Sequence, residues 1–167
     1  GGQGFTITEL NSGNSTKGKT IIIWYKGTQT TVGGNYSIGV PILGDPSIGW
    51  GAIGIDGGKI ATNSGSTSYT DTGTTNVADG NWHMLTWVHS DGTLARLNNG
   101  DMGMWVDGVY ENKHDIYAYN NHNAYFVIHD MFQVYGSGWD QPTKVDAFQI
   151  FDDELTDAQI LEIYQGG

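Results

Sequence analysis

The sequence predicts an all-β protein in which short strands form two stacked antiparallel sheets, followed by one short C-terminal helix. Three observations favour this fold class. Runs of β-branched and aromatic residues are short, turn residues separate them, and 26 glycines are scattered between the runs. Four Asp-Gly pairs suit tight turns, because glycine reaches positive φ without a steric clash. A chain of this length can bury one core, so residues 1–167 are expected to form a single domain.

The strand expected at the centre of the fold covers residues 82–89 and follows a turn at Asp79 and Gly80. Its side chains alternate between two faces, and both faces carry large apolar residues. We therefore expect both faces to be covered, as in a central strand. One face carries Trp82, Met84, Thr86 and Val88, and the other carries His83, Leu85, Trp87 and His89.

Proline and glycine divide the rest of the chain into further strands. Pro41 cannot donate a ladder hydrogen bond, so its strand is expected at a sheet edge or a bulge. The turn at residues 56–58 joins a hairpin, whereas the polar residues 62–76 are expected to form a surface loop with weak strand character near Tyr69. The other strands are expected at residues 4–9, 20–26, 36–43, 49–55, 59–61, 102–106, 109–110, 125–128 and 145–151.

One helix is expected, at the C-terminal end of the sequence. Thr156 suits the N-cap position, and Gln159 follows three residues later, as in a capping box. Leu155 and Ile160 are spaced as a hydrophobic staple, and Gly166 can end the helix. A helix this short depends on packing against the sheets for its stability.

Charge and composition restrict the partners. Lys and Arg number 7 against 18 Asp and Glu, giving a net charge of −11, which opposes binding to nucleic acid and anionic membranes. No apolar run approaches the roughly 18 residues that span a bilayer, so no membrane insertion is expected. The chain has no cysteine, so no disulfide bond can form within it. The sequence is also compatible with a module of a larger chain or assembly.

Four segments, taken in order, resemble the laminin-G-like (LamG-like, pentraxin-like) branch of the concanavalin A-like jelly rolls. They match that family's hydrophobic first strand, its Asp-Gly-x-Trp-His strand, its Val-Asp-Gly hairpin and its last strand with the following helix. The resemblance implies a jelly-roll sandwich. Gln149 departs from the family's Arg-type residue, and residues 111–124 and 129–144 look like longer and more aromatic loops. The matching segments are residues 20–26, 79–85, 104–109 and 145–160.

Catalytic motifs are missing from the sequence. Glycosidases of this superfamily place two carboxylates on one strand face, but residues 152–154 precede the helix and are not on a strand. There is no Gly-x-Ser-x-Gly elbow and no cysteine nucleophile. His83 and His89 share a strand face but are roughly 20 Å apart, too far to share a metal. We therefore expect a protein that is not an enzyme.

The resemblance also implies a bound Ca²⁺, since many laminin-G-like domains hold one at a rim of the sandwich. Asp146 is the candidate metal ligand. Strand alternation places it on the face of Phe148 and Ile150, where a lone inward carboxylate is costly unless paired. The alternative is a carboxylate bonded to backbone N–H groups or to a lysine. The aspartates expected mainly to form turns are Asp56, Asp79, Asp91 and Asp107.

Exposed aromatic rings beside amides and carboxylates are typical of carbohydrate sites, because a ring can stack on a sugar while polar groups bind its hydroxyls. Two aromatic loops and one tryptophan among glycines have this composition; the alternative is that they cover sheet edges or a subunit contact. Four other tryptophans, at positions 24, 82, 87 and 105, are expected in the core. The candidate ligand-binding residues are Trp139, Tyr135, Asp140, Trp50 and Tyr119.

The sequence therefore leads to two hypotheses of different classes. The first is a non-catalytic recognition or adhesion module that binds carbohydrate at a cell or particle surface, with Ca²⁺ as its expected ion. The second is a structural or assembly protein, such as a virion decoration, tail or fibre component, whose partner is a neighbouring structural protein. Either places the chain outside the cell, on a cell surface or on a virion. The fold alone does not choose between them.

Overall fold

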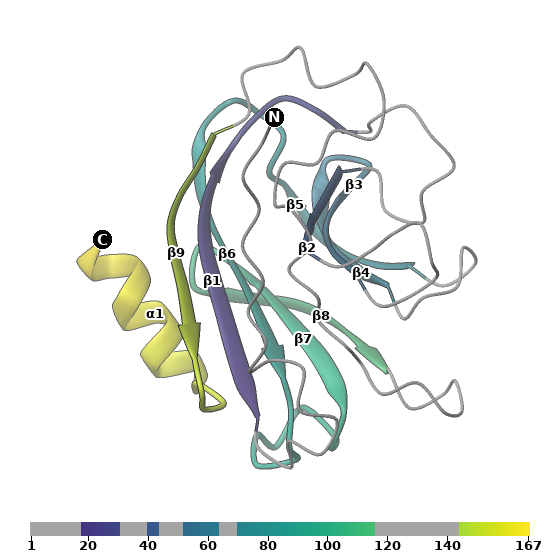
Figure 1. Ribbon diagram of the computed structural model, residues 1–167, viewed down its shortest axis with the longest axis vertical. Helices are drawn as coiled ribbons and strands as arrows, with labels where there is room; N and C mark the ends of the chain where they lie inside the picture. Colours follow the sequence, from purple (N-terminus) through teal and green to yellow (C-terminus); the bar gives the residue numbers. More distant parts are fainter. Residues whose placement is uncertain (1–17, 31–39, 44–51, 64–69, 116–143) are drawn as a thin grey trace, which may run out of the picture.

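The computed structural model describes residues 18–30, 40–43, 52–63, 70–115 and 144–167, which form two antiparallel sheets and one helix (Figure 1). The strand order is β8-β7-β6-β1-β9 in the five-stranded sheet and β2-β3-β4-β5 in the four-stranded sheet. The fold class expected from the sequence, an all-β sandwich with one short C-terminal helix, is confirmed. The strands are β1 (Lys19–Lys26), β2 (Val40–Leu43), β3 (Ala52–Asp56), β4 (Lys59–Asn63), β5 (Thr70–Asn76), β6 (Trp82–His89), β7 (Asp101–Val106), β8 (Val109–Asp115) and β9 (Lys144–Phe151).

Strand β6 lies in the middle of the five-stranded sheet, as its two apolar faces predict. Leu85 and Trp87 are fully buried in the core between the sheets. Met84 and Val88 belong to a second apolar cluster on the outer face of the same sheet. The Trp87 indole N–H also donates to the carbonyl of Ala61 on β4 at 3.1 Å, which ties the two sheets together across the core.

Helix α1 (Asp157–Gly166) covers part of the outer face of the five-stranded sheet, away from the four-stranded sheet (Figure 1). The expected capping box is present: the Thr156 hydroxyl accepts from the Gln159 backbone N–H, and the Gln159 side chain accepts from the Thr156 backbone N–H. Trp105 lies beneath the helix, and its indole N–H donates to Asp157 at 3.1 Å. In the described part of the chain, no helix is long and apolar enough to cross a membrane.

Strand β2 confirms the expectation for its proline. It lies at the edge of the four-stranded sheet, and its pairing with β3 shifts register between Pro41 and Leu43. Both features leave room for a residue that has no backbone N–H to donate.

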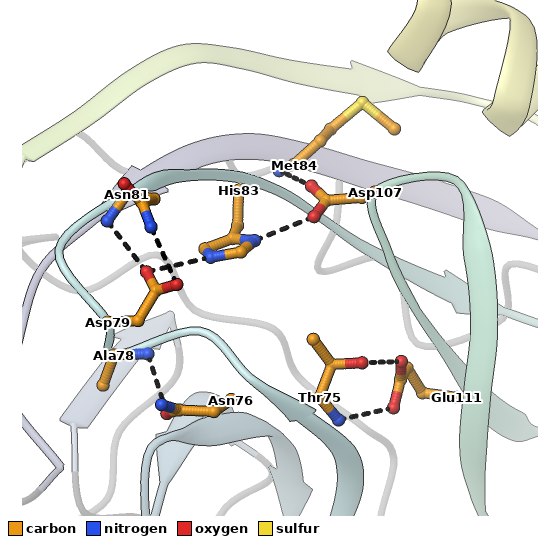
Figure 2. A network of polar contacts seen from close by, with 9 residues as sticks. All are labelled: Thr75, Asn76, Ala78, Asp79, Asn81, His83, Met84, Asp107 and Glu111. Carbon is orange, nitrogen blue, oxygen red and sulfur yellow. Dashed lines mark hydrogen bonds and ion pairs between the residues drawn. The ribbon is translucent and has the colours of Figure 1, made fainter.

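Two polar segments form strands where the sequence predicts loops. Strand β5 pairs with β4, and β8 continues to Asp115 instead of ending near Tyr110. The two strands belong to different sheets, and Glu111 of β8 accepts hydrogen bonds from the backbone N–H groups of Thr74 and Thr75 at 2.5 and 3.0 Å (Figure 2 shows the Thr75 contact). Long-range polar contacts of this kind leave no periodic apolar pattern in the sequence, which is why the pattern missed both strands.

Replacing Glu111 by alanine should lower the free energy of unfolding by about 2 kcal/mol, since the hydrogen bonds to a carboxylate are lost together. Its two oxygens accept from both hydroxyls and both amides of Thr74 and Thr75. Urea denaturation measures the change, and Glu162→Ala on the exposed side of α1 is the matched control. An equal loss in the two variants would contradict the role assigned to Glu111.

The same contact should weaken in acid. Burial opposes ionisation of Glu111, but the hydrogen bonds from Thr74 and Thr75 outweigh it and lower the pKa of this carboxyl below its usual 4.5. The stabilisation is therefore present above the unfolded-state pKa, and it is lost as pH falls through the lower folded-state pKa.

A bulge in β9 reverses its alternation. Ala147 has φ +47°, and the pairing of β9 with β1 shifts register between Ile22 and Trp24. Asp146 therefore lies on the outer face, opposite Trp24, and the expectation that it shares a face with Phe148 is wrong. The physical reason is that one extra residue moves every preceding side chain to the other face. The β9 side chains that pack against the inner core are Val145, Phe148 and Ile150.

Candidate ligand-binding groove

An open groove of about 660 Å³ lies on the outer face of the five-stranded sheet, at the C-terminal end of α1. Three adjacent strands, β6, β1 and β9, supply one side of the groove, and the last turn of the helix supplies the other. Pockets of this size and composition, with apolar walls and a few polar groups, are the usual form of a small-ligand site. The lining residues are Trp24, Trp82, Asp146, Ala147, Gln149, Ile163, Gly166 and Gly167.

Two tryptophans form the aromatic part of the groove. Trp24 is half-buried, and its ring stacks on Tyr164 of the helix with centroids 5.9 Å apart and planes 23° apart. Trp82 is 41% exposed, so the expectation that it lies in the core is wrong. Trp82 is the first residue of β6, and on the outer face its side chain is the neighbour of Met84 toward the start of the strand. The apolar cluster under the helix includes Met84 and Trp24 but not Trp82.

The polar part of the groove comes from β9, an edge strand. Asp146 and Gln149 are both exposed, and Asp146 Oδ1 accepts from the backbone N–H of Ala147 at 2.7 Å. A carboxylate accepts hydrogen bonds and an amide both accepts and donates them. The groove can therefore hold a molecule that has a flat apolar face for the indoles and hydroxyl or amide groups for the polar edge.

A second polar cluster joins the start of β6 to the β7–β8 turn (Figure 2). His83 Nδ1 lies 2.8 Å from Asp107 Oδ2, and His83 Nε2 lies 3.1 Å from Asp79 Oδ1. Asp107 Oδ1 also accepts from the Met84 backbone N–H at 2.8 Å. Because a carboxylate occupies each ring nitrogen, neither nitrogen is free to take a proton from a substrate. We name this group the His83 clasp and assign it a structural role.

The pKa values in the clasp follow from these contacts. Burial alone would lower the pKa of His83, but its hydrogen bonds to Asp107 and Asp79 and their charges raise it above 6.5. The backbone N–H and side chain of Asn81 lower the pKa of Asp79 to about 2. Asp79 and Asp107 stand at turns, as the sequence predicts, but no local pattern reveals that they share a histidine.

Among the site residues predicted from the sequence, Asp146 is the one that falls in the described part of the chain. It lines the groove and faces outward. The described part of the chain holds no group of three or more His, Cys, Asp or Glu able to bind a metal ion, so Ca²⁺ at Asp146 stays a prediction. The sequence did not indicate Trp82 or Gln149 as binding residues. For Gln149, the available signal was its departure from the Arg-type residue of the resembled family. The predictions that fall outside the described residues are Trp139, Tyr135, Asp140, Trp50 and Tyr119.

Comparison with known proteins identifies the fold. No family model and no curated protein matches the sequence. Among solved structures, the receptor-binding domain of botulinum neurotoxin D matches 90% of this chain with a TM-score of 0.59 and 14% identity. The binding domain of Paraclostridial Mosquitocidal Protein 1 matches 91% with a TM-score of 0.59 and 10% identity. The chain spans 37% and 38% of the lengths of those two chains. At such low identity the likeness shows a shared β-sandwich fold and nothing finer.

Proposed function

We propose that this chain is a non-catalytic recognition module that binds carbohydrate at a cell or particle surface, and that the outer groove is its binding site. The observation that carries the proposal is the exposed indole of Trp82 beside Trp24, with Asp146 and Gln149 at the same groove. The C–H face of a sugar ring is apolar and its rim is polar. The groove offers a surface complementary to each.

Two further observations support recognition as the general function. The solved structures of the same fold include domains described as receptor-binding. The sequence resembles laminin-G-like domains, and we place the chain in that branch of the concanavalin A-like jelly rolls as part of the proposal. This placement puts the module outside the cell, on a cell surface or on a virion, with a surface glycan as its partner.

A glycan array followed by calorimetry on the best binder tests the proposal. Trp82→Ala should weaken binding about 30-fold or more, because an aromatic anchor at the centre of a site contributes about 2 kcal/mol. Val109→Ala is the matched control, since Val109 is 61% exposed on β8 at the far edge of the same sheet. Val109→Ala should leave the affinity unchanged.

Two further measurements distinguish the groove from the binding sites predicted from the sequence. Trp139→Ala tests the aromatic loop predicted from the sequence, and a chelator tests the predicted Ca²⁺ at Asp146. Binding that depends on Trp139 and not on Trp82 would move the site away from the groove. If no glycan binds and light scattering shows a discrete oligomer, in which Trp82 is shielded, the result would favour an assembly protein instead.

A further inference from the structure

Two lysines face each other on the outer surface beside the groove. Lys26 of β1 pairs with Trp82 of β6 on one side and with Lys144 of β9 on the other. The next row of outward side chains along these strands is Asp146, Trp24 and Met84. Cβ atoms directly opposite each other on antiparallel strands are about 4.5–5.5 Å apart. Both ammonium groups can therefore reach one point next to the Trp82 indole.

This pair is unusual in an acidic chain with only 7 Lys and Arg residues. Within the described part of the chain, the side chain of neither Lys26 nor Lys144 makes an ion pair or a hydrogen bond. Asp146 lies in the adjacent row, but it accepts from its neighbour's backbone N–H and pairs with neither lysine. Three of the four other described Lys and Arg residues have acidic partners: Lys19 pairs with Asp152, Arg96 with Asp157 and Lys113 with Asp101.

Two like charges placed directly opposite each other destabilise a sheet. A bound anion removes this repulsion and forms charge-assisted hydrogen bonds with both ammonium groups. Lys144 is exposed and Lys26 is half-buried, so an anion can approach from solvent. The repulsion in the unliganded protein and the adjacent exposed indole both point to a ligand that carries a negative group next to a ring.

We infer that Lys26 and Lys144 form an anion subsite of the groove, and that the glycan bound there carries a carboxylate or sulfate group. The acidic group sits between the two ammonium groups while a sugar ring stacks on Trp82. This inference rests on the proposed function and adds the chemical class of the ligand. The net charge of −11 repels extended polyanions, so a short glycan with one or two acidic groups fits the site better than a long sulfated chain.

The test uses an array on which each oligosaccharide is printed in neutral, carboxylated and sulfated forms, with calorimetry on the best matched set. The acidic form should bind about tenfold more tightly than its neutral counterpart, and Lys26→Gln with Lys144→Gln should abolish that preference. The neutral form should lose less than about twofold in the same double variant. Lys59→Gln on β4, in the other sheet, is the matched control and should retain the preference.

The double variant should remain folded, with an unfolding temperature equal to or above that of the parent, because the substitutions remove a repulsion. Equal binding of neutral and acidic forms, with loss of both in Trp82→Ala, would overturn the anion subsite and leave the proposed function standing. A preference for acidic forms that survives in the double variant would also overturn it. Binding to vesicles of anionic phospholipid without binding to any glycan would overturn both proposals.

Discussion

Replacing Trp105 by alanine should lower the free energy of unfolding by about 3–5 kcal/mol, the usual cost of deleting a fully buried large aromatic side chain. Trp105 is 0% exposed, and it packs edge-on against Tyr110 with ring centroids 5.2 Å apart. Its indole N–H donates to Asp157 in the first turn of α1. The variant loses the packing under the helix and the hydrogen bond that holds the helix start. Urea denaturation followed by circular dichroism measures the loss.

Trp82→Ala is the matched control for Trp105→Ala. The same atoms are removed from the same face of the same sheet, but Trp82 is 41% exposed. Surface substitutions usually change stability by less than about 0.5 kcal/mol, so we expect a near-parental unfolding curve together with the loss of glycan binding described above. If Trp82→Ala unfolds the protein as readily as Trp105→Ala does, then Trp82 is a packing residue and the groove loses its main support.

Replacing Asp107 by alanine should cost about 3 kcal/mol, because a hydrogen bond from the Met84 backbone to a carboxylate is lost and a residue without a polar side chain is left at positive φ. Asp107 has φ +52° and accepts from the Met84 N–H and from His83. Asp107→Asn separates the contribution of the charge from those of the hydrogen bond and the backbone conformation. Asparagine tolerates this conformation and can still accept from Met84, so it removes mainly the charge.

The pH dependence follows from His83. Because the folded-state pKa of His83 is raised above 6.5, its contribution to stability is fully present below the unfolded-state pKa and is lost as pH rises through the folded-state pKa. The stability difference between the parent protein and Asp107→Asn should therefore be larger at pH 6 than at pH 8, near the histidine titration. A titration of His83 by NMR should show a lower pKa in Asp107→Asn. A difference that does not change with pH would show that the clasp does not depend on the imidazolium charge.

The two sets of variants address different parts of the same sheet. Trp105 and Asp107 concern how the outer face and the β7–β8 turn are held. Trp82, Lys26 and Lys144 concern the ligand that we propose for that face. Since the first pair should change stability and the second set should change affinity, one panel of purified variants separates the fold from the proposed recognition.

Local sequence determined most of the architecture. The alternation in residues 82–89 determined a strand with two covered faces, because neighbouring side chains on a strand point in opposite directions. Thr156 and Gln159 determined where the helix begins, because capping is a contact within one turn. Only the tertiary structure decided that β5 is a strand, since its support comes from its pairing with β4 and from Glu111 in the other sheet.

The groove also depended on tertiary structure. The bulge at Ala147 turned Asp146 outward, and the end of α1 left Trp82 uncovered beside Trp24. The lysine pair arose from the register of β9 against β1, which joins residues 118 positions apart in Lys26 and Lys144. Periodicity reports the direction of a side chain only until an extra residue intervenes, and it carries no information about which distant strand lies alongside. The sequence by itself therefore determined the strands and the helix start, and the pairing of distant strands decided the site.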